Sequence, residues 1–157
     1  MKTHTASPIT LLLYTLAPLA AQQPAERRPP VGIPSEAKLF NGKWYHLFLE
    51  RAGWKQARDK CTRLGGQLVV IPDATTQEFV QQLSKGLHIW LGATDEKTEG
   101  LWLWVDGTEM KFSAWGKWQP DNGNKREHYL DLWDGLWNDS AQNSPLNVGF
   151  ICEWKDK

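Results

Sequence analysis

The chain has 157 residues with 18 basic and 18 acidic side chains, so its formal net charge is zero. This length fits one domain better than two. The balanced charge, without any basic stripe, argues against a nucleic-acid partner. No apolar run reaches the roughly 20 residues that a membrane span requires.

The first 36 residues resemble an export signal followed by a linker. Lys2 and His4 precede an apolar run over residues 9–19, and Ala20-Ala21 follows. This pattern predicts a signal peptide over residues 1–21, with a disordered start or a short anchor as the alternative. Residues 22–36 are rich in proline, which predicts a linker. We therefore expect the folded domain over residues 37–157, in a secreted or periplasmic protein.

The first half of this domain predicts one strand, one helix, a short strand and a second helix. Aromatic and apolar residues fill both faces of residues 43–49, as in a buried strand. A helix is predicted by apolar residues at helical spacing: Trp54, Ala57, Cys61 and Leu64. A short strand over residues 67–71 ends at Pro72, and Thr75 with Glu78 forms a capping box for the second helix.

The second half predicts strands separated by long polar connections. The strands are expected at residues 88–92, 101–105, 129–133 and 148–154. Because the helices come first and the strands later, the fold class is α+β. The connection over residues 114–127 is long enough to indicate a functional loop, and Trp115 and Trp118 are expected to pin it down.

The ten tryptophans are expected mainly in the core, because each buries a large area and the domain is small. Stacking on a sugar is the alternative role for any one of them. The two cysteines, Cys61 and Cys152, lie near opposite ends of the domain. In an exported chain a disulfide is the natural interpretation. Two free buried thiols are the alternative, and a metal or redox pair is disfavoured because no CxxC motif occurs.

Two polar clusters offer the oxygen atoms that calcium prefers as ligands. One is Gln119-Pro120-Asp121-Asn122 with Glu127, and the other is Asn138-Asp139. A cis peptide bond before Pro120, which X-Pro bonds permit, would turn the side chains on either side of it the same way. Such residues also fill ordinary loops, so composition alone leaves a plain polar loop as the alternative.

Five short motifs follow one another along the domain: Trp90-Leu91-Gly92-Ala93, Trp104-Val105-Asp106-Gly107, residues 118–122, residues 135–139 and Phe150-Ile151-Cys152-Glu153. In this order they resemble the C-type lectin domain, from about Phe40 to Trp154. The resemblance implies two helices packed on small antiparallel sheets, with a long irregular loop region. It also implies a disulfide between Cys61 and Cys152 that links the first helix to the last strand.

The resemblance further implies a calcium-dependent carbohydrate-binding site. Its metal and carbohydrate ligands would be Gln119, Asp121, Glu127, Asn138 and Asp139, the last also through its backbone carbonyl. Gln-Pro-Asp is the family's galactose-type order, whereas Glu-Pro-Asn is its mannose-type order. The expected function is therefore a secreted lectin of galactose type with Ca2+ as cofactor and a glycan as partner.

A second calcium site is implied at Asp95, Glu99 and Asn122. Only half of that site matches the family, because Asn122 and His128 stand where carboxylates are usual. A solvated turn is the alternative for the acidic residues over 95–99. His128 could also contact the sugar or the ion, whereas His46 and His88 lie in strand patterns and are expected to be structural.

Other departures favour a different function on the same scaffold. Tyr129 stands where the family has a cysteine of a second disulfide, Gly123 stands where galactose-type members carry a tryptophan, and residues 140–147 are polar and uncharged. The alternative is thus a protein-binding or structural module without sugar. No HExxH, Gly-x-Ser-x-Gly or phosphate-loop motif occurs, so no enzyme is expected. Without coiled-coil heptads, the sequence predicts no oligomeric state.

Overall fold

The structure is a computed structural model that describes residues 27–156. The expected signal peptide over 1–21 and the first residues of the expected linker lie outside the described residues, and the domain boundary after residue 36 stays a prediction. The elements, in chain order, are β1 Lys38–Phe40, β2 Lys43–Phe48, α1 Trp54–Arg63, β3 Gln67–Leu68, α2 Ala74–Ser84, β4 Ile89–Thr94, β5 Leu103–Trp104, the 3-10 turn η1 Gly123–Lys125, β6 Tyr129–Trp133, β7 Leu136–Ser140 and β8 Gly149–Lys155.

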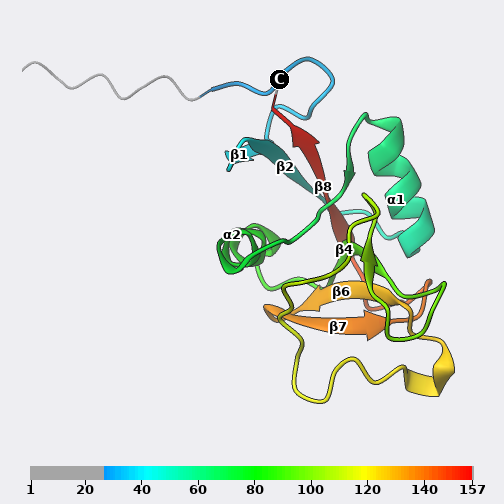
Figure 1. Cartoon of the computed structure of the whole chain (residues 1–157). Coiled ribbons are helices and arrows are strands. Elements are labelled where there is room, and N and C mark those ends of the chain that lie inside the picture. Colours follow the sequence, from blue (N-terminus) through cyan, green and yellow to red (C-terminus); the bar gives the residue numbers. More distant parts are fainter. Residues whose placement is uncertain (1–26, 157) are drawn as a thin grey trace, which may run out of the picture.

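All the strands of the described region join into one sheet of eight strands. Its main path runs β1-β2-β8-β4-β6-β7, with β3 paired to β8 and β5 paired to β4 (Figure 1). The pair β4 and β8 is parallel, at Ile89 and Trp90 against Gly149 and Phe150. The predicted α+β class with two helices is confirmed. The small antiparallel sheets of the prediction are joined into one mixed sheet, because this parallel pair connects them.

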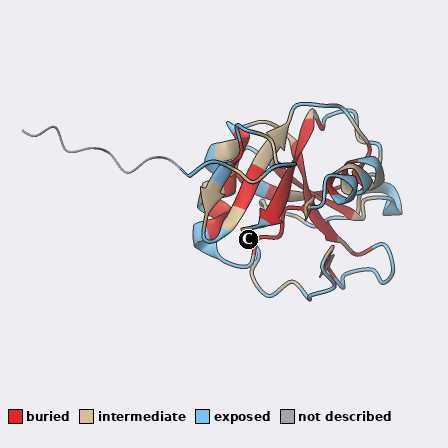
Figure 2. Ribbon diagram, turned by 90° about the horizontal axis from the view of Figure 1, so that it is seen from above, coloured by how far each residue is buried: buried red, intermediate tan, exposed pale blue. Residues whose placement is uncertain are grey.

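The two helices lie on opposite sides of the β2 and β8 strands (Figure 1). Period-two alternation along the strands explains this arrangement. In β8, Phe150 and Cys152 belong to the same cluster as Cys61 of α1, while Ile151 belongs to the cluster that contains Val80 of α2. The strand β8 therefore contributes side chains to both halves of the core. The buried residues concentrate in the central strands (Figure 2).

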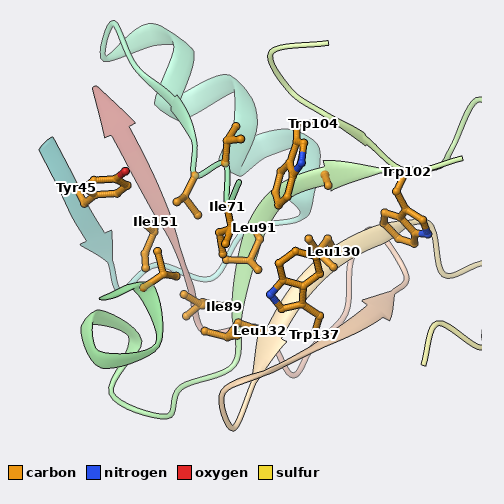
Figure 3. Close-up of a cluster of buried hydrophobic side chains, with 14 residues drawn as sticks. Tyr45, Ile71, Ile89, Leu91, Trp102, Trp104, Leu130, Leu132, Trp137 and Ile151 are labelled. Atoms are coloured by element: carbon orange, nitrogen blue, oxygen red, sulfur yellow. The ribbon is translucent and has the colours of Figure 1, made fainter. Parts of the chain in front are cut away.

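Tryptophans fill most of this core, as predicted. Seven of the ten are buried: Trp44, Trp54, Trp90, Trp102, Trp104, Trp137 and Trp154. Trp104 and Trp137 meet edge to face with ring centroids 5.7 Å apart, beside Leu130 (Figure 3). Of the other three, Trp115 is partly buried, whereas Trp118 and Trp133 are 80% and 61% exposed.

The predicted disulfide between Cys61 and Cys152 is confirmed. It links α1 to β8 and joins residues 91 positions apart in the sequence. Both sulfurs lie in the fully buried cluster beneath α1. Because the bond uses both cysteines of the chain, the alternative of two free thiols is wrong.

The capping box predicted for α2 is not the one that the structure uses. The helix begins at Ala74, and Asp73 is its N-cap because the Thr76 N–H donates to the Asp73 carboxylate over 2.8 Å. The Thr75 hydroxyl donates to the same carboxylate. The aspartate, which carries two acceptor oxygens, thus accepts from both groups, and the N-cap lies two residues before the predicted Thr75.

The long connection between β5 and β6 is held against β7 by backbone hydrogen bonds. The Trp137 N–H donates to the Ala114 carbonyl, and the Gly116 N–H donates to the Trp137 carbonyl, each over 2.8 Å. Trp115 packs edge to face on Trp102 and Trp137, so it pins the loop as predicted. Trp118, which was expected to do the same, points into solvent instead. Among residues 27–156, no helix is long and apolar enough to cross a membrane.

Candidate functional site

The five predicted ligand residues come from two adjoining segments. Gln119, Asp121 and Glu127 lie on the long loop that runs beside the β6–β7 hairpin, and Asn138 and Asp139 lie on β7 (Figure 1). The Gln119–Pro120 peptide bond is cis. The loop reaches β7 because that strand is at the end of the sheet path and its outer side has no further strand to pair with in the described region.

Three carboxylates converge where the loop meets β7. Asp121, Glu127 and Asp139 each place an oxygen within 4.8 Å of the others. Asp139 is buried, whereas Asp121 is exposed and Glu127 is intermediate. None of the ion pairs in residues 27–156 involves any of the three. Three negative charges without a basic partner form a site that favours a bound cation.

Asp139 ties the loop to β7. Its carboxylate accepts hydrogen bonds from the backbone N–H groups of Asp121 and Asn122, over 3.1 and 2.7 Å. Burial raises the pKa of Asp139 above its usual value, and these two donors oppose the rise. The same carboxylate therefore orients the loop that carries Asp121, and it faces the other two acids.

Glu127 closes the other side of the cluster. Burial raises the pKa of its carboxyl, the backbone donor at Gly123 opposes the rise, and the charges of Asp139 and Asp121 add to it. The Gly123 N–H donates to Glu127 over 3.0 Å, and the Glu127 N–H donates to the Asn122 side-chain oxygen over 3.2 Å. A β-carbon at residue 123 would lie 2.7 Å from the Glu127 carboxylate, so any larger residue would displace that side chain from its present position.

The two amide side chains differ in what they already bond. The Gln119 Oε1 atom is buried and has no hydrogen-bond partner in the described region, which is an unfavourable state for an amide oxygen unless a ligand completes it. The Asn138 Nδ2 donates to the Asp139 backbone carbonyl over 2.6 Å and to the Ser140 hydroxyl over 3.1 Å. The amide oxygen of Asn138 is thereby turned away from its own strand.

The second predicted cluster is also assembled, but its members bond to one another. Asp95, Glu99 and His128 place one ligand atom each within 4.8 Å of the others. His128 Nδ1 lies 3.1 Å from Asp95 and 3.4 Å from Glu99, and the Asn122 amide donates to Glu99. Asp95 is buried and accepts the Gly100 N–H, so the solvated-turn interpretation is wrong for this residue, whereas Glu96 and Glu99 are exposed.

Sequence reasoning missed the part that two residues play in the first cluster. Gly123 was noted only for the tryptophan that it replaces, and Asn122 was named as a source of oxygen but not as a support of Glu127. Both support Glu127, and no residue pattern indicates a hydrogen bond across a loop. The close approach at Gly123 follows from the folded path of residues 122–127.

Comparison with known proteins places these observations in a family. The family model for the C-type lectin domain matches residues 50–154. The hepatic lectin of Gallus gallus is 34% identical over 128 residues, covering 79% of this chain and 61% of that protein. A perlucin-like protein of Mytilus galloprovincialis is 30% identical over 131 residues, covering 78% of this chain and 83% of that protein.

A solved structure agrees with the sequence matches. The carbohydrate-recognition domain of the mouse scavenger receptor C-type lectin superimposes with a TM-score of 0.73 at 31% identity. The match covers 80% of this chain and all of that domain. The chain spans less than two thirds of the Gallus gallus lectin, so it corresponds to the domain rather than to that whole protein.

Proposed function

This chain belongs to the C-type lectin domain family, a family of non-enzymatic binding domains, and we propose that it binds a carbohydrate through one calcium ion. The ligands would be Gln119, Asp121, Glu127, Asn138 and Asp139. The observation that carries the proposal is the convergence of three unpaired carboxylates from two segments of the chain. The intramolecular disulfide and the expected signal peptide support a location outside the cytoplasm.

The residues present suit calcium. They supply carboxylate and amide oxygens only, which is the ligand chemistry of a hard cation. The buried Gln119 oxygen has no partner within the described residues, and a cation would satisfy it. When bound, calcium would neutralise the three acids and offer its remaining coordination positions to two adjacent sugar hydroxyls.

The protein's own contribution is to hold these oxygens together before any ligand arrives. The backbone donors at Asp121 and Asn122 fix the loop on Asp139, and Gly123 fixes Glu127. Mutual repulsion among the acids would otherwise separate the two segments. The hydrogen bonds therefore preorganise a site that is poor in positive charge and ready for a cation.

We propose a galactose-type preference from the Gln-Pro-Asp order of residues 119–121. The amide of this motif sets on which side of the ion a hydroxyl meets a hydrogen-bond donor. The tryptophan that galactose-type members carry after the motif is absent. Gly123 cannot be replaced by it without displacing Glu127. The preference for galactose would therefore depend on hydrogen bonding near the ion rather than on an aromatic ring at residue 123.

We propose that no second ion is bound at Asp95, Glu99 and Asn122, because His128 and Asn122 already contact these carboxylates. We propose that the side-chain contacts brace this part of the loop in place of an ion.

The melting temperature of the purified full-length chain tests the proposal. Calcium should raise it relative to a chelator, and galactose should raise it further, because each ligand binds only the folded state. Asp121→Ala should abolish both rises. Asp59→Ala, which removes an exposed carboxylate on α1, is the matched control and should leave them unchanged.

Each other outcome has a distinct meaning. A response to mannose instead of galactose would contradict only the galactose preference. A response to calcium without any response to sugars would favour the protein-binding module. Absence of a calcium response at millimolar concentration would overturn the proposed calcium-dependent carbohydrate site and leave only the fold.

A further inference from the structure

A pocket of about 390 Å3 adjoins the proposed calcium site. Gln119 and Asn138, two of the proposed ligands, form its wall on the side of the site. The rest of the lining includes Lys117, Trp133, Asp134 and Leu136. The pocket and the proposed site thus share two side chains, so the pocket lies directly beside the proposed site.

An aromatic ring is presented at this pocket. Trp133 ends β6 and is 61% exposed, which is unusual in a chain that buries most of its tryptophans. One face of the ring is covered, because it stacks on His88 with centroids 5.6 Å apart and an angle of 14° between the planes. Leu136, which pairs with Trp133 across the β6–β7 hairpin, is half exposed and extends the apolar surface.

The ring is braced from behind by buried polar groups. His88 Nε2 lies 2.8 Å from the carboxylate of Asp131, which is fully buried. The Asn147 amide donates to the same carboxylate over 2.9 Å. His88 lies against these buried groups, although its Nε2 atom makes no hydrogen bond within the described residues. Trp133 stacks on the His88 ring, which limits its positions on that face. A tryptophan restricted in this way loses less conformational entropy when a ligand packs on it than a freely rotating one.

The pocket combines the features that recognise a sugar ring. Its apolar surface at Trp133 and Leu136 suits the C–H face of a pyranose. The amide nitrogen of Gln119 and the charges of Lys117 and Asp134 suit hydroxyl groups around that ring. A purely apolar partner would make no use of these polar groups, so the lining favours a sugar.

We propose that this pocket is a second sugar subsite, which holds the residue next to the one bound at the calcium site. The proposal rests on the proposed function, because the sugar residue bound at the calcium site would place its covalently linked neighbour in the pocket. The ligand class is therefore an oligosaccharide rather than a monosaccharide, and Trp133 is the residue that selects it.

Calorimetric titrations with paired probes test this subsite in the presence of calcium. The probes are galactose against lactose, and mannose against mannotriose. The native chain should bind the oligosaccharide of one pair about ten-fold more tightly than its monosaccharide, a difference of about 1.4 kcal/mol. Trp133→Ala should bring that ratio close to one and leave monosaccharide affinity unchanged, and Trp133→Phe should keep part of it.

Trp118→Ala is the matched control, because Trp118 is also exposed and is adjacent to Gln119 in sequence but does not line the pocket. It should not alter the ratio. An independent readout is the indole N–H resonance of Trp133, identified by its loss in Trp133→Phe. This resonance should shift with the preferred oligosaccharide and stay in place with the monosaccharide.

The failures are distinguishable. Equal affinity for mono- and oligosaccharides in both pairs would overturn the subsite and leave the calcium site intact. An equal loss of both affinities in Trp133→Ala would also overturn it, because the ring would then serve the calcium site alone. If no probe binds in calcium, the proposed function itself fails.

Discussion

At the scale of single residues, Gly123 controls the position of the Glu127 carboxylate. Gly123→Ala would place a methyl group 2.7 Å from that carboxylate, so the acid must move. The neighbour is the end of a flexible side chain, and stability without calcium should hardly change. Calcium affinity measured by calorimetry should fall about 10- to 100-fold, the range for disturbed support of a metal ligand.

Two outcomes of this substitution would contradict the model of the site. Unchanged calcium affinity would show that Glu127 is not a ligand or that its position is not fixed by residue 123. A large loss of stability in chelator would show that the glycine serves the fold rather than the ligand set. Glu127→Gln provides the matched comparison, because it keeps the size of the side chain and removes the charge.

At the scale of the elements, one buried charge joins β2 to β8. Glu153 on β8 is almost fully buried and accepts hydrogen bonds from Lys43 on β2 and from Gln67, over 2.8 and 2.9 Å. Burial raises the pKa of Glu153 above its usual 4.5, and Lys43 opposes the rise. The folded chain thus binds this proton more tightly than the unfolded chain, so the ionised group lowers stability above the raised pKa.

Lys43→Met should make the folding stability depend more strongly on pH. The substitution removes the strongest opposing donor, and the pKa of Glu153 should rise further. We expect a loss of about 1–3 kcal/mol in the free energy of unfolding at neutral pH, because a buried acceptor loses its partner. The loss should shrink as the pH falls through the raised pKa of Glu153, because the carboxyl is then protonated in the folded state of both the native chain and the variant.

Urea unfolding across this pH range measures the effect. Lys55→Met is the control, because its partner Glu96 is partly exposed and such surface pairs contribute little. A loss that stayed constant with pH would mean that Lys43 stabilises the strands by packing and not by its charge.

The elements also separate what the sequence could predict from what it could not. Residues 43–49 and 129–133 carry dense apolar patterns, and both were predicted as strands within a residue or two. β7 was missed because Asn138, Asp139 and Ser140 are weak strand formers that tertiary pairing holds in place. Helix α1 was found because its apolar spacing and the glycines after it agree.

The candidate site shows the same division. Its five ligand residues were named from the motif, because oxygen-bearing residues at that spacing are recognisable. Their convergence depends on backbone donors from Asp121 and Asn122 to Asp139, which lie 17 to 18 residues away in sequence. The exposed rings of Trp118 and Trp133 could not be told from buried ones, because exposure depends on how the loop and hairpin pack.

At the scale of the whole molecule, covalent and non-covalent bracing lie in different regions. The disulfide ties α1 to β8, the last strand of the sheet. The long loop has no such bond. The loop is held by the contacts of Trp115 with Trp102 and Trp137. Tyr129 stands at a cysteine position of the family and packs on Trp54 instead of forming a disulfide. Calcium would therefore stabilise the region that the disulfide does not reach.

This division predicts how the molecule responds when the disulfide is removed. The pair Cys61→Ala and Cys152→Ala releases a loop of 91 residues. Chain entropy sets the loss at about 4–5 kcal/mol as an upper value, which is a large share of the stability of a small domain. Calcium should still raise the urea midpoint of the double variant, because the five proposed ligands lie outside the cluster that holds the two cysteines. If calcium no longer stabilised a double variant that remains folded, the proposed calcium site would not form without the disulfide, and the loop would depend on the bond between α1 and β8.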